Sequence, residues 1–163
     1  MRIISTRRTF AALAALALCA ASPAIASART SATPTSSRAT AAAGACKSKT
    51  KGVTEVVDFT NLGGTIEVAC DTGKPKTGLA ALTGAGFHYA FVKKYPGFIC
   101  RIDGLPDPCN GAPASAYWSY WHAPQGGSWK FSDKGAGDYD PKQGSVQGWA
   151  FGADKAPGMA PPG

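Results

Sequence analysis

Hydrophobic and polar positions alternate along several short stretches in the middle of the chain. Residues 53–59 are rich in β-branched side chains, and residues 65–70 alternate apolar with polar side chains, a pattern typical of strands. Residues 61–64 (Asn-Leu-Gly-Gly) lie between these stretches and have the composition of a turn. The pattern therefore predicts a β-hairpin over residues 53–70.

The spacing of apolar residues becomes helical after this hairpin. Leu79 and Leu82 are three positions apart and share one face of a helix. Thr77 precedes them at the position of an N-cap, and glycines follow them at the other end. We expect a short helix over residues 78–86.

Further stretches predict strands because they alternate, or because they combine β-branched with aromatic residues. They are residues 87–92, 98–102, 116–122, 127–132 and 144–151. The order of a hairpin, a helix and further strands predicts an α+β fold with a mostly antiparallel sheet and one short helix.

Composition indicates a single domain with flanking segments. The chain has 163 residues, of which 44% are hydrophobic and 17% charged, so it is not disordered throughout. Residues 29–45 are almost wholly Ala, Thr, Ser, Arg and Pro, which predicts a flexible linker. The Pro/Gly-rich residues 153–163 predict a flexible tail. The domain is therefore expected to cover residues 46–152.

The formal net charge of +7 does not indicate a nucleic-acid-binding surface. Residues 53–152 contain 8 Lys and Arg against 9 Asp and Glu, so the expected domain is close to neutral. A phosphate-binding surface needs clustered basic residues, and Lys93 and Lys94 are the only adjacent basic pair in this range. We expect no nucleic-acid partner.

Residues 1–28 have the features of an export signal. Three arginines precede an apolar stretch, residues 10–21, that is too short to span a bilayer as a helix. Small-residue cleavage sites follow, and we favour cleavage after Ala28 over cleavage after Ala26. Arg7 and Arg8 leave a twin-arginine route open beside ordinary secretion. The mature protein is expected to be secreted, extracellular or cell-wall associated, with no integral membrane segment.

An even number of cysteines remains after the predicted signal, which in a small exported domain indicates two disulfides. These cysteines are Cys46, Cys70, Cys100 and Cys109. Three connectivities are possible, and spacing alone does not choose among them. We favour Cys46–Cys70 and Cys100–Cys109, because each pair flanks a predicted hairpin or loop. A zinc site is disfavoured because the chain has no Cys-x-x-Cys pair.

The most distinctive stretch is Tyr-Trp-Ser-Tyr-Trp-His at residues 117–122. Successive side chains of a strand point to opposite faces, so Tyr117 and Trp121 share one face while Trp118 and His122 share the other. One helix can cover only one face of a single sheet, so some rings are expected at the surface or in a groove. Such rings would form a platform for a planar ligand, a sugar or a partner protein. The alternative is that the rings fill the core.

Catalytic signals are few. The sequence has no nucleophile elbow, zinc-protease or phosphate-loop motif, and its cysteines are expected to be oxidised. His122 is expected to end a strand. Asp138 and Asp140 flank Tyr139 in a Gly/Pro-rich loop, which is more typical of a turn than of an acid–base pair. We expect a protein that is not an enzyme, with no catalytic residue and no metal site.

Four short motifs follow one another along the predicted domain. They are Thr-Gly-Leu-Ala-Ala-Leu at residues 77–82, Ile-Asp-Gly at 102–104, Tyr-Trp at 117–118, and Tyr-x-Pro-x-x-Gly-x-Val at 139–146. Together they resemble the small C-terminal β domain of transcobalamin and intrinsic factor, and of related secreted bacterial proteins. The resemblance covers roughly residues 53–152 and implies a β-grasp-like fold.

The resemblance also implies a binding role. In the cobalamin carriers this domain closes over one face of the corrin, and an α-helical barrel domain supplies most of the site. We therefore expect a secreted, non-catalytic module for a cobalamin-like flat ligand, completed by a helical-barrel partner. The alternative is a cell-surface module that binds protein or polysaccharide. The resemblance points to Tyr117, Trp118 and Tyr139 as ligand contacts, and the aromatic pattern adds Trp121, His122 and Trp129.

Overall fold

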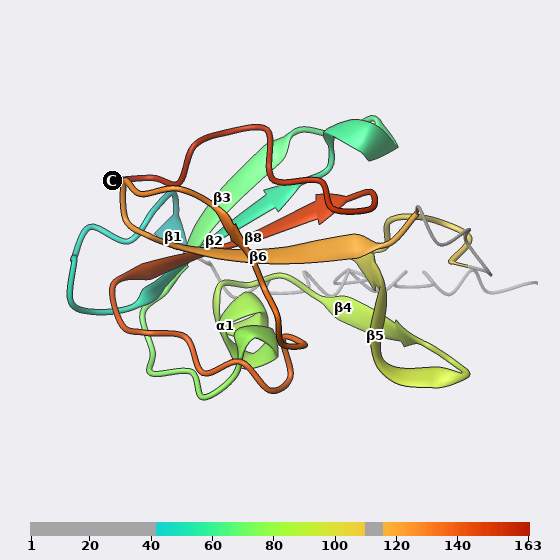
Figure 1. Cartoon of the computed structure of the whole chain (residues 1–163), viewed down its shortest axis with the longest axis horizontal. Helices are drawn as coiled ribbons and strands as arrows, with labels where there is room; N and C mark the ends of the chain where they lie inside the picture. The colour runs from blue at the N-terminus through green and yellow to red at the C-terminus, as the bar shows by residue number, and fades with distance from the viewer. Residues whose placement is uncertain (1–41, 110–115) are drawn as a thin grey trace, which may run out of the picture. The chain divides into compact units, whose positions relative to one another are not determined.

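A computed structural model describes residues 42–109 and 116–163 of the chain (Figure 1). The predicted signal at residues 1–28 and most of the predicted linker lie outside these residues. The described part consists of a six-stranded sheet, a separate two-stranded sheet and one short α-helix. The predicted combination of sheet with a single short helix is confirmed.

The main sheet has the strand order β1-β3-β2-β8-β6-β7. Its strands are β1 (Ala42–Ala43), β2 (Val53–Asp58), β3 (Ile66–Asp71), β6 (Trp118–Pro124), β7 (Lys130–Phe131) and β8 (Ser145–Phe151). The second sheet is the hairpin of β4 (Tyr89–Val92) and β5 (Tyr95–Ile102), and the helical elements are the 3-10 turn η1 (Thr60–Leu62) and α1 (Gly78–Gly84). No helix in the described ranges is long and apolar enough to cross a membrane.

The predicted β-hairpin is formed by β2 and β3. The two strands pair antiparallel from Val53 opposite Asp71 to Asp58 opposite Ile66. The turn between them contains η1, and the residue that follows it, Gly63, lies in the left-handed region at φ +79°. Sequence pattern and local turn chemistry were therefore sufficient to predict this unit.

Among the described strands, one pair is parallel, and it lies at the centre of the main sheet. β2 and β8 pair parallel, with Glu55 opposite Gln147 and Val57 opposite Trp149. β8 pairs antiparallel with β6 on its other side. The first long strand of the domain and the last one are thus neighbours, and the other pairings are antiparallel.

Helix α1 begins as the sequence predicts. The Thr77 hydroxyl oxygen accepts a hydrogen bond from the Ala80 N–H at 3.0 Å and caps the helix. A Cβ added to Gly78 would collide with the Tyr120 hydroxyl and lie 2.7 Å from Gln147 Oε1. The glycine therefore allows the helix to start directly against the sheet. The helix ends at Gly84, two residues before the predicted end.

One face of the main sheet forms the hydrophobic core. Helix α1 and the β4–β5 hairpin cover this face, which we call the inner face (Figure 1). The buried cluster comprises Val57, Phe59, Ala69, Leu82, Ala85, Phe87, Ile99, Ile102, Trp118, Tyr120, Ala136 and Trp149. Many of the aromatic residues therefore fill the core, which is the alternative to a surface platform.

The opposite, outer face is covered by residues 153–163, which were expected to be a flexible tail. After β8 the chain turns back along the sheet to the C-terminus (Figure 1). Trp121 Nε1 donates to the Lys155 carbonyl at 2.7 Å, and Trp129 Nε1 donates to the Met159 carbonyl at 2.7 Å. The Gly158 N–H donates to Asp58 Oδ2 at 2.7 Å. Proline and glycine content indicated a loop but could not show that its carbonyls have indole partners on the sheet.

Both favoured cysteine pairs are formed. The Cα atoms of Cys46 and Cys70 are 4.9 Å apart, and those of Cys100 and Cys109 are 5.6 Å apart, within the normal range for disulfides. The first pair joins the start of the domain to β3. The second ties β5 to the loop that follows it.

The substitution Trp129→Phe tests whether the C-terminal segment is held as described. It keeps an apolar ring and removes the indole donor to the Met159 carbonyl. We expect the free energy of unfolding to fall by about 1 kcal/mol in urea titrations. Lys130→Ala, at the exposed neighbouring position, is the control and should leave the free energy of unfolding unchanged. Equal stability of Trp129→Phe and the native protein would contradict the anchoring role.

Candidate ligand-binding site

A row of aromatic rings runs along the inner face of β6. The Tyr120 ring lies 4.5 Å from the Trp149 ring and 5.8 Å from the Tyr139 ring, measured between centroids. The His122 ring stacks on Tyr139 at 4.6 Å with an interplanar angle of 18°. The alternation of side chains along β6 places Trp118, Tyr120 and His122 in this row, as predicted.

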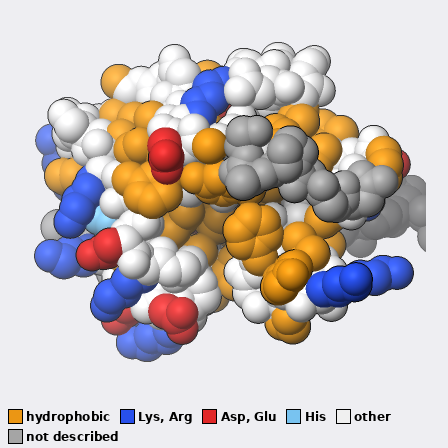
Figure 2. All heavy atoms as spheres, turned by 45° about the vertical axis from the view of Figure 1, so that its right-hand side comes forward, with side chains coloured by type: hydrophobic (Ala, Val, Ile, Leu, Met, Phe, Trp, Pro, Cys, Tyr) orange, Lys and Arg blue, Asp and Glu red, His pale blue; other side chains and the backbone are white. Residues whose placement is uncertain are grey.

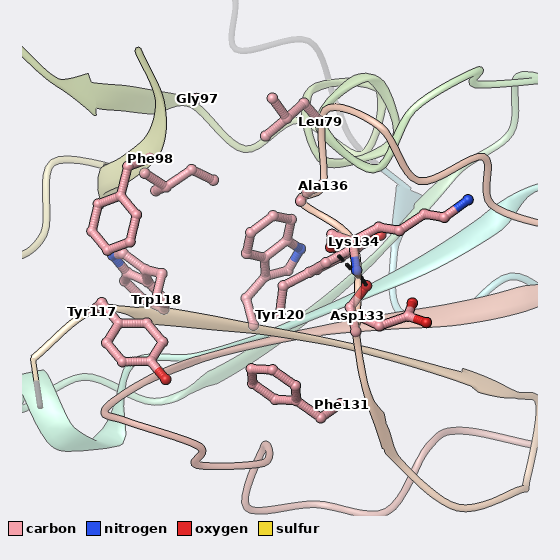
Figure 3. Close-up of a pocket in the computed structure, with 14 residues that line it drawn as sticks. Leu79, Gly97, Phe98, Tyr117, Trp118, Tyr120, Phe131, Asp133, Lys134 and Ala136 are labelled. Carbon is pink, nitrogen blue, oxygen red and sulfur yellow. Dashed lines mark hydrogen bonds between the residues drawn. The ribbon is translucent and has the colours of Figure 1, made fainter. Parts of the chain in front are cut away.

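A pocket of about 270 Å³ opens at the Trp118 end of the row (Figure 3). Phe98 of β5 and Tyr117 lie on one side of the pocket, and their ring centroids are 6.1 Å apart. Leu79 of α1 and Ala136 lie above it in the view of Figure 3. The rings of Trp118, Tyr120 and Trp149 also line it. Elements far apart in sequence therefore combine to make an aromatic recess.

Polar groups of the pocket come mainly from residues 132–135. The Ser132 hydroxyl donates to the Lys134 carbonyl at 2.8 Å, which fixes the shape of this segment. Figure 3 shows the Asp133 and Lys134 side chains on the opposite side of the pocket from Phe98 and Tyr117. The recess is thus apolar on one side and polar on the other, a combination typical of small-molecule sites.

The mouth of the pocket is hydrophobic. Phe98 and Phe131, which both line the pocket, keep 49% and 42% of their surface exposed. In Figure 2, hydrophobic side chains gather in the middle of the face shown, and many charged side chains lie towards its margin. Exposed apolar surface is a common feature of ligand-binding and partner-binding sites.

A second cavity, of about 350 Å³, lies at the other end of the aromatic row. His122, Tyr139, Lys142 and Ser145 are among its lining residues. Burial lowers the pKa of His122 below its ordinary value, and the charge of nearby Lys130 lowers it further. Burial also raises the pKa of Tyr139, and the carboxylates of Asp133 and Asp140 add to this. Both stacked rings are therefore neutral at pH 7.

The six predicted ligand contacts do not form a single surface. Tyr117 and Trp118 line the pocket at one end of β6, and His122 and Tyr139 line the cavity at the other end. Trp121 and Trp129 lie on the outer face, where their indole N–H groups are bonded to the C-terminal segment. The premise that only one face of the sheet is covered was wrong, because residues 153–163 cover the outer face.

Phe98 and Leu79 line the pocket but were not among the predicted contacts. Apolar spacing predicts Leu79 in the helix, and strand composition predicts Phe98 in a strand, but neither pattern indicates a pocket. Phe98 follows Gly97, which adopts φ +95°, and the Phe98 ring is exposed. The contact between Phe98 and Tyr117 could not be read from local pattern.

A buried polar network lies directly behind the pocket rings. Glu55 is fully buried in β2, accepting hydrogen bonds from Gln147 Nε2 at 2.6 Å and Trp149 Nε1 at 2.9 Å. The Tyr120 hydroxyl donates to Gln147 Oε1. Burial raises the pKa of Glu55 well above its ordinary value, although the two hydrogen bonds oppose this rise. The network fixes the orientation of two pocket rings.

The described residues contain no group of three or more His, Cys, Asp or Glu side chains that could hold a metal ion. The arrangement that they do contain is a recess bounded by rings. Its chemistry is that of stacking and apolar burial.

Comparison with known proteins gives one partial match. A family model described as the SCO2322-like domain matches residues 110–162. This range is less than half of the chain, and it includes β6, β7, β8 and most of the C-terminal segment. No curated protein and no solved structure matches significantly.

Glu55 predicts a pH dependence of stability. A carboxyl with a raised pKa holds its proton in the folded state over a pH range in which the unfolded chain has released it. The free energy of unfolding contributed by this group therefore falls as pH rises above the ordinary carboxyl pKa. The stability difference between native protein and Glu55→Gln should fall between pH 4 and pH 8 in urea titrations. A constant or rising difference would contradict the assignment.

Proposed function

We propose that this protein is a non-catalytic module that binds a small flat ligand in the pocket between β5, β6 and residues 131–136. The observation that carries the proposal is the recess of about 270 Å³ bounded by Phe98, Tyr117 and Trp118. Planar apolar groups are held well by such rings, because stacking and burial act together. We assign no enzymatic role to the site.

The strand order supports a β-grasp-like classification. The β2–β3 hairpin is followed along the chain by helix α1. The last strand, β8, lies between β2 and β6 in the sheet. The order β3-β2-β8-β6, with β2 and β8 parallel, supports this part of the proposal. We therefore retain the relation to the transcobalamin C-terminal domain as part of the proposal.

The size of the pocket supports a shared site. A recess of about 270 Å³ lies just below the usual range for ligand sites and is too small to enclose a whole corrin. A cobalamin-like ligand would place one edge or substituent here. A helical-barrel partner would then cover the remainder, as it does in the cobalamin carriers that the sequence resembles.

We also propose that the protein works outside the cytoplasm, either secreted or associated with the cell wall. Two disulfides in a small domain are typical of oxidising compartments. This assignment agrees with the export signal expected over residues 1–28.

Titration calorimetry with cobalamin tests the proposal, using residues 29–163, which include every described contact. We expect measurable binding that Phe98→Ala and Tyr117→Ala each weaken by about tenfold, because each removes a ring that lines the pocket. Tyr95→Ala is the matched control, since Tyr95 is exposed on the same hairpin and does not line the pocket. Binding that is absent, or equal in all three variants, would contradict the proposal.

The second candidate function is attachment to a cell-surface protein or polysaccharide. The exposure of Phe98 and Phe131 at the mouth of the pocket favours it. Titration with soluble cell-wall oligosaccharides and capture by cell-envelope proteins test it with the same variants. Binding to an oligosaccharide or an envelope protein, with no heat of binding to cobalamin, would replace the first candidate function with the second.

A further inference from the structure

The β4–β5 hairpin concentrates exposed rings in one small element. Among the described residues, the exposed large hydrophobic side chains are Phe91, Tyr95, Phe98 and Phe131. The first three belong to this hairpin, and Tyr95 is 66% exposed. The hairpin forms its own two-stranded sheet and reaches away from the main sheet in Figure 1.

The same hairpin is positively charged. Lys93 and Lys94 occupy the turn between β4 and β5 and are exposed. Residues 89–102 also contain Arg101 and have no acidic residue. Arg101 is paired with Asp107 at 3.3 Å, whereas Lys93 and Lys94 form no ion pair with the described residues, so the positive charge is concentrated at the turn. In an otherwise nearly neutral domain, this turn is a local cationic site next to exposed rings.

The base of the hairpin is held firmly while its tip faces solvent. Ile99 and Ile102 of β5 are buried in the core, and Cys100 is bonded to Cys109. At the tip, Gly97 adopts φ +95°, and a Cβ added there would meet nothing within 4 Å. The rings and ammonium groups are therefore presented together on a fixed support, which lowers the entropy cost of binding.

The chemistry of the tip fits a lipid surface better than other occupants. Ammonium groups bind lipid phosphates, while Tyr and Phe rings enter the boundary between headgroups and acyl chains. A soluble polyanion would pair with the lysines but would offer no apolar phase for the rings. A second copy of the hairpin would bring like charges together.

We propose that the β4–β5 hairpin docks this protein on an anionic lipid surface. Lys93 and Lys94 contact the phosphate groups, and Tyr95 and Phe91 enter the interface beside them. Neither lysine, nor Phe91 or Tyr95, lines the pocket, so the proposal is independent of the ligand function. A single ring or a single charge would bind only marginally, and the combination supplies the two signals that stable attachment needs.

Vesicle sedimentation of residues 29–163 tests this proposal, with phosphatidylcholine vesicles that contain or lack about one third phosphatidylglycerol. We expect binding only to the anionic vesicles. Lys93→Glu combined with Lys94→Glu should weaken it by at least about tenfold, since each basic residue near such a surface contributes about a fivefold factor. Tyr95→Ser should weaken it about threefold or more, and Tyr95→Phe should retain it.

The matched control is Lys74→Glu combined with Lys76→Glu, an exposed lysine pair distant in sequence from the hairpin. Equal losses in the two charge-reversed pairs would overturn the proposal, because binding would then follow net charge alone. Binding to soluble polyphosphate that matches the vesicle affinity and ignores Tyr95 would also overturn it, in favour of a polyanion. Cobalamin titration of the Lys93→Glu/Lys94→Glu variant keeps the two proposals apart. Unchanged cobalamin binding with lost vesicle binding concerns the hairpin alone, whereas lost cobalamin binding in the native protein concerns the ligand function alone.

Discussion

The parallel pairing of β2 with β8 is the constraint on which the domain depends. It brings the first long strand beside the last, and it sets Glu55 opposite Gln147 in the centre of the sheet. The buried carboxyl then accepts hydrogen bonds from Gln147 and from Trp149. Because side chains alternate along each strand, this register also decides which rings face the helix and which face the C-terminal segment.

The two faces of the sheet have different roles as a consequence. On the inner face, rings of β6 and β8 pack under α1 and leave a recess where β5 approaches β6. On the outer face, the indoles of Trp121 and Trp129 hold the C-terminal segment. A chain with one short helix thus covers both faces of its sheet, and the surplus of aromatic residues divides between support of the fold and the candidate site.

Local signals in the sequence predicted the local units. The hairpin of β2 and β3, the Thr77 cap of α1, the alternation along β6 and the two cysteine pairs all depend on neighbouring residues or on the elements that they flank. The parallel β2–β8 pairing and the anchoring of residues 153–163 depend on contacts between distant segments. Neither leaves a periodic trace in the sequence, which is why Trp121 and Trp129 were placed in the candidate site.

Only half of the candidate site was predicted, because the other half also depends on contacts between distant segments. Tyr117 and Trp118 stood out because aromatic residues are dense in one strand. Phe98 and Leu79 belong to other elements and meet those rings only after the hairpin and helix have packed on the sheet. A recess made by several elements is recognised from tertiary structure, whereas its richest strand is recognised from composition.

The most direct measurement is the proton–nitrogen NMR spectrum of the indole N–H groups during titration with cobalamin. The chain has 4 tryptophans, and all of them lie in the described domain, two on each face of the main sheet. Our account predicts that the signals of Trp118 and Trp149, which line the pocket, shift more than those of Trp121 and Trp129. Shifts confined to Trp121 and Trp129, or no shift at any tryptophan, would contradict a ligand site on the inner face.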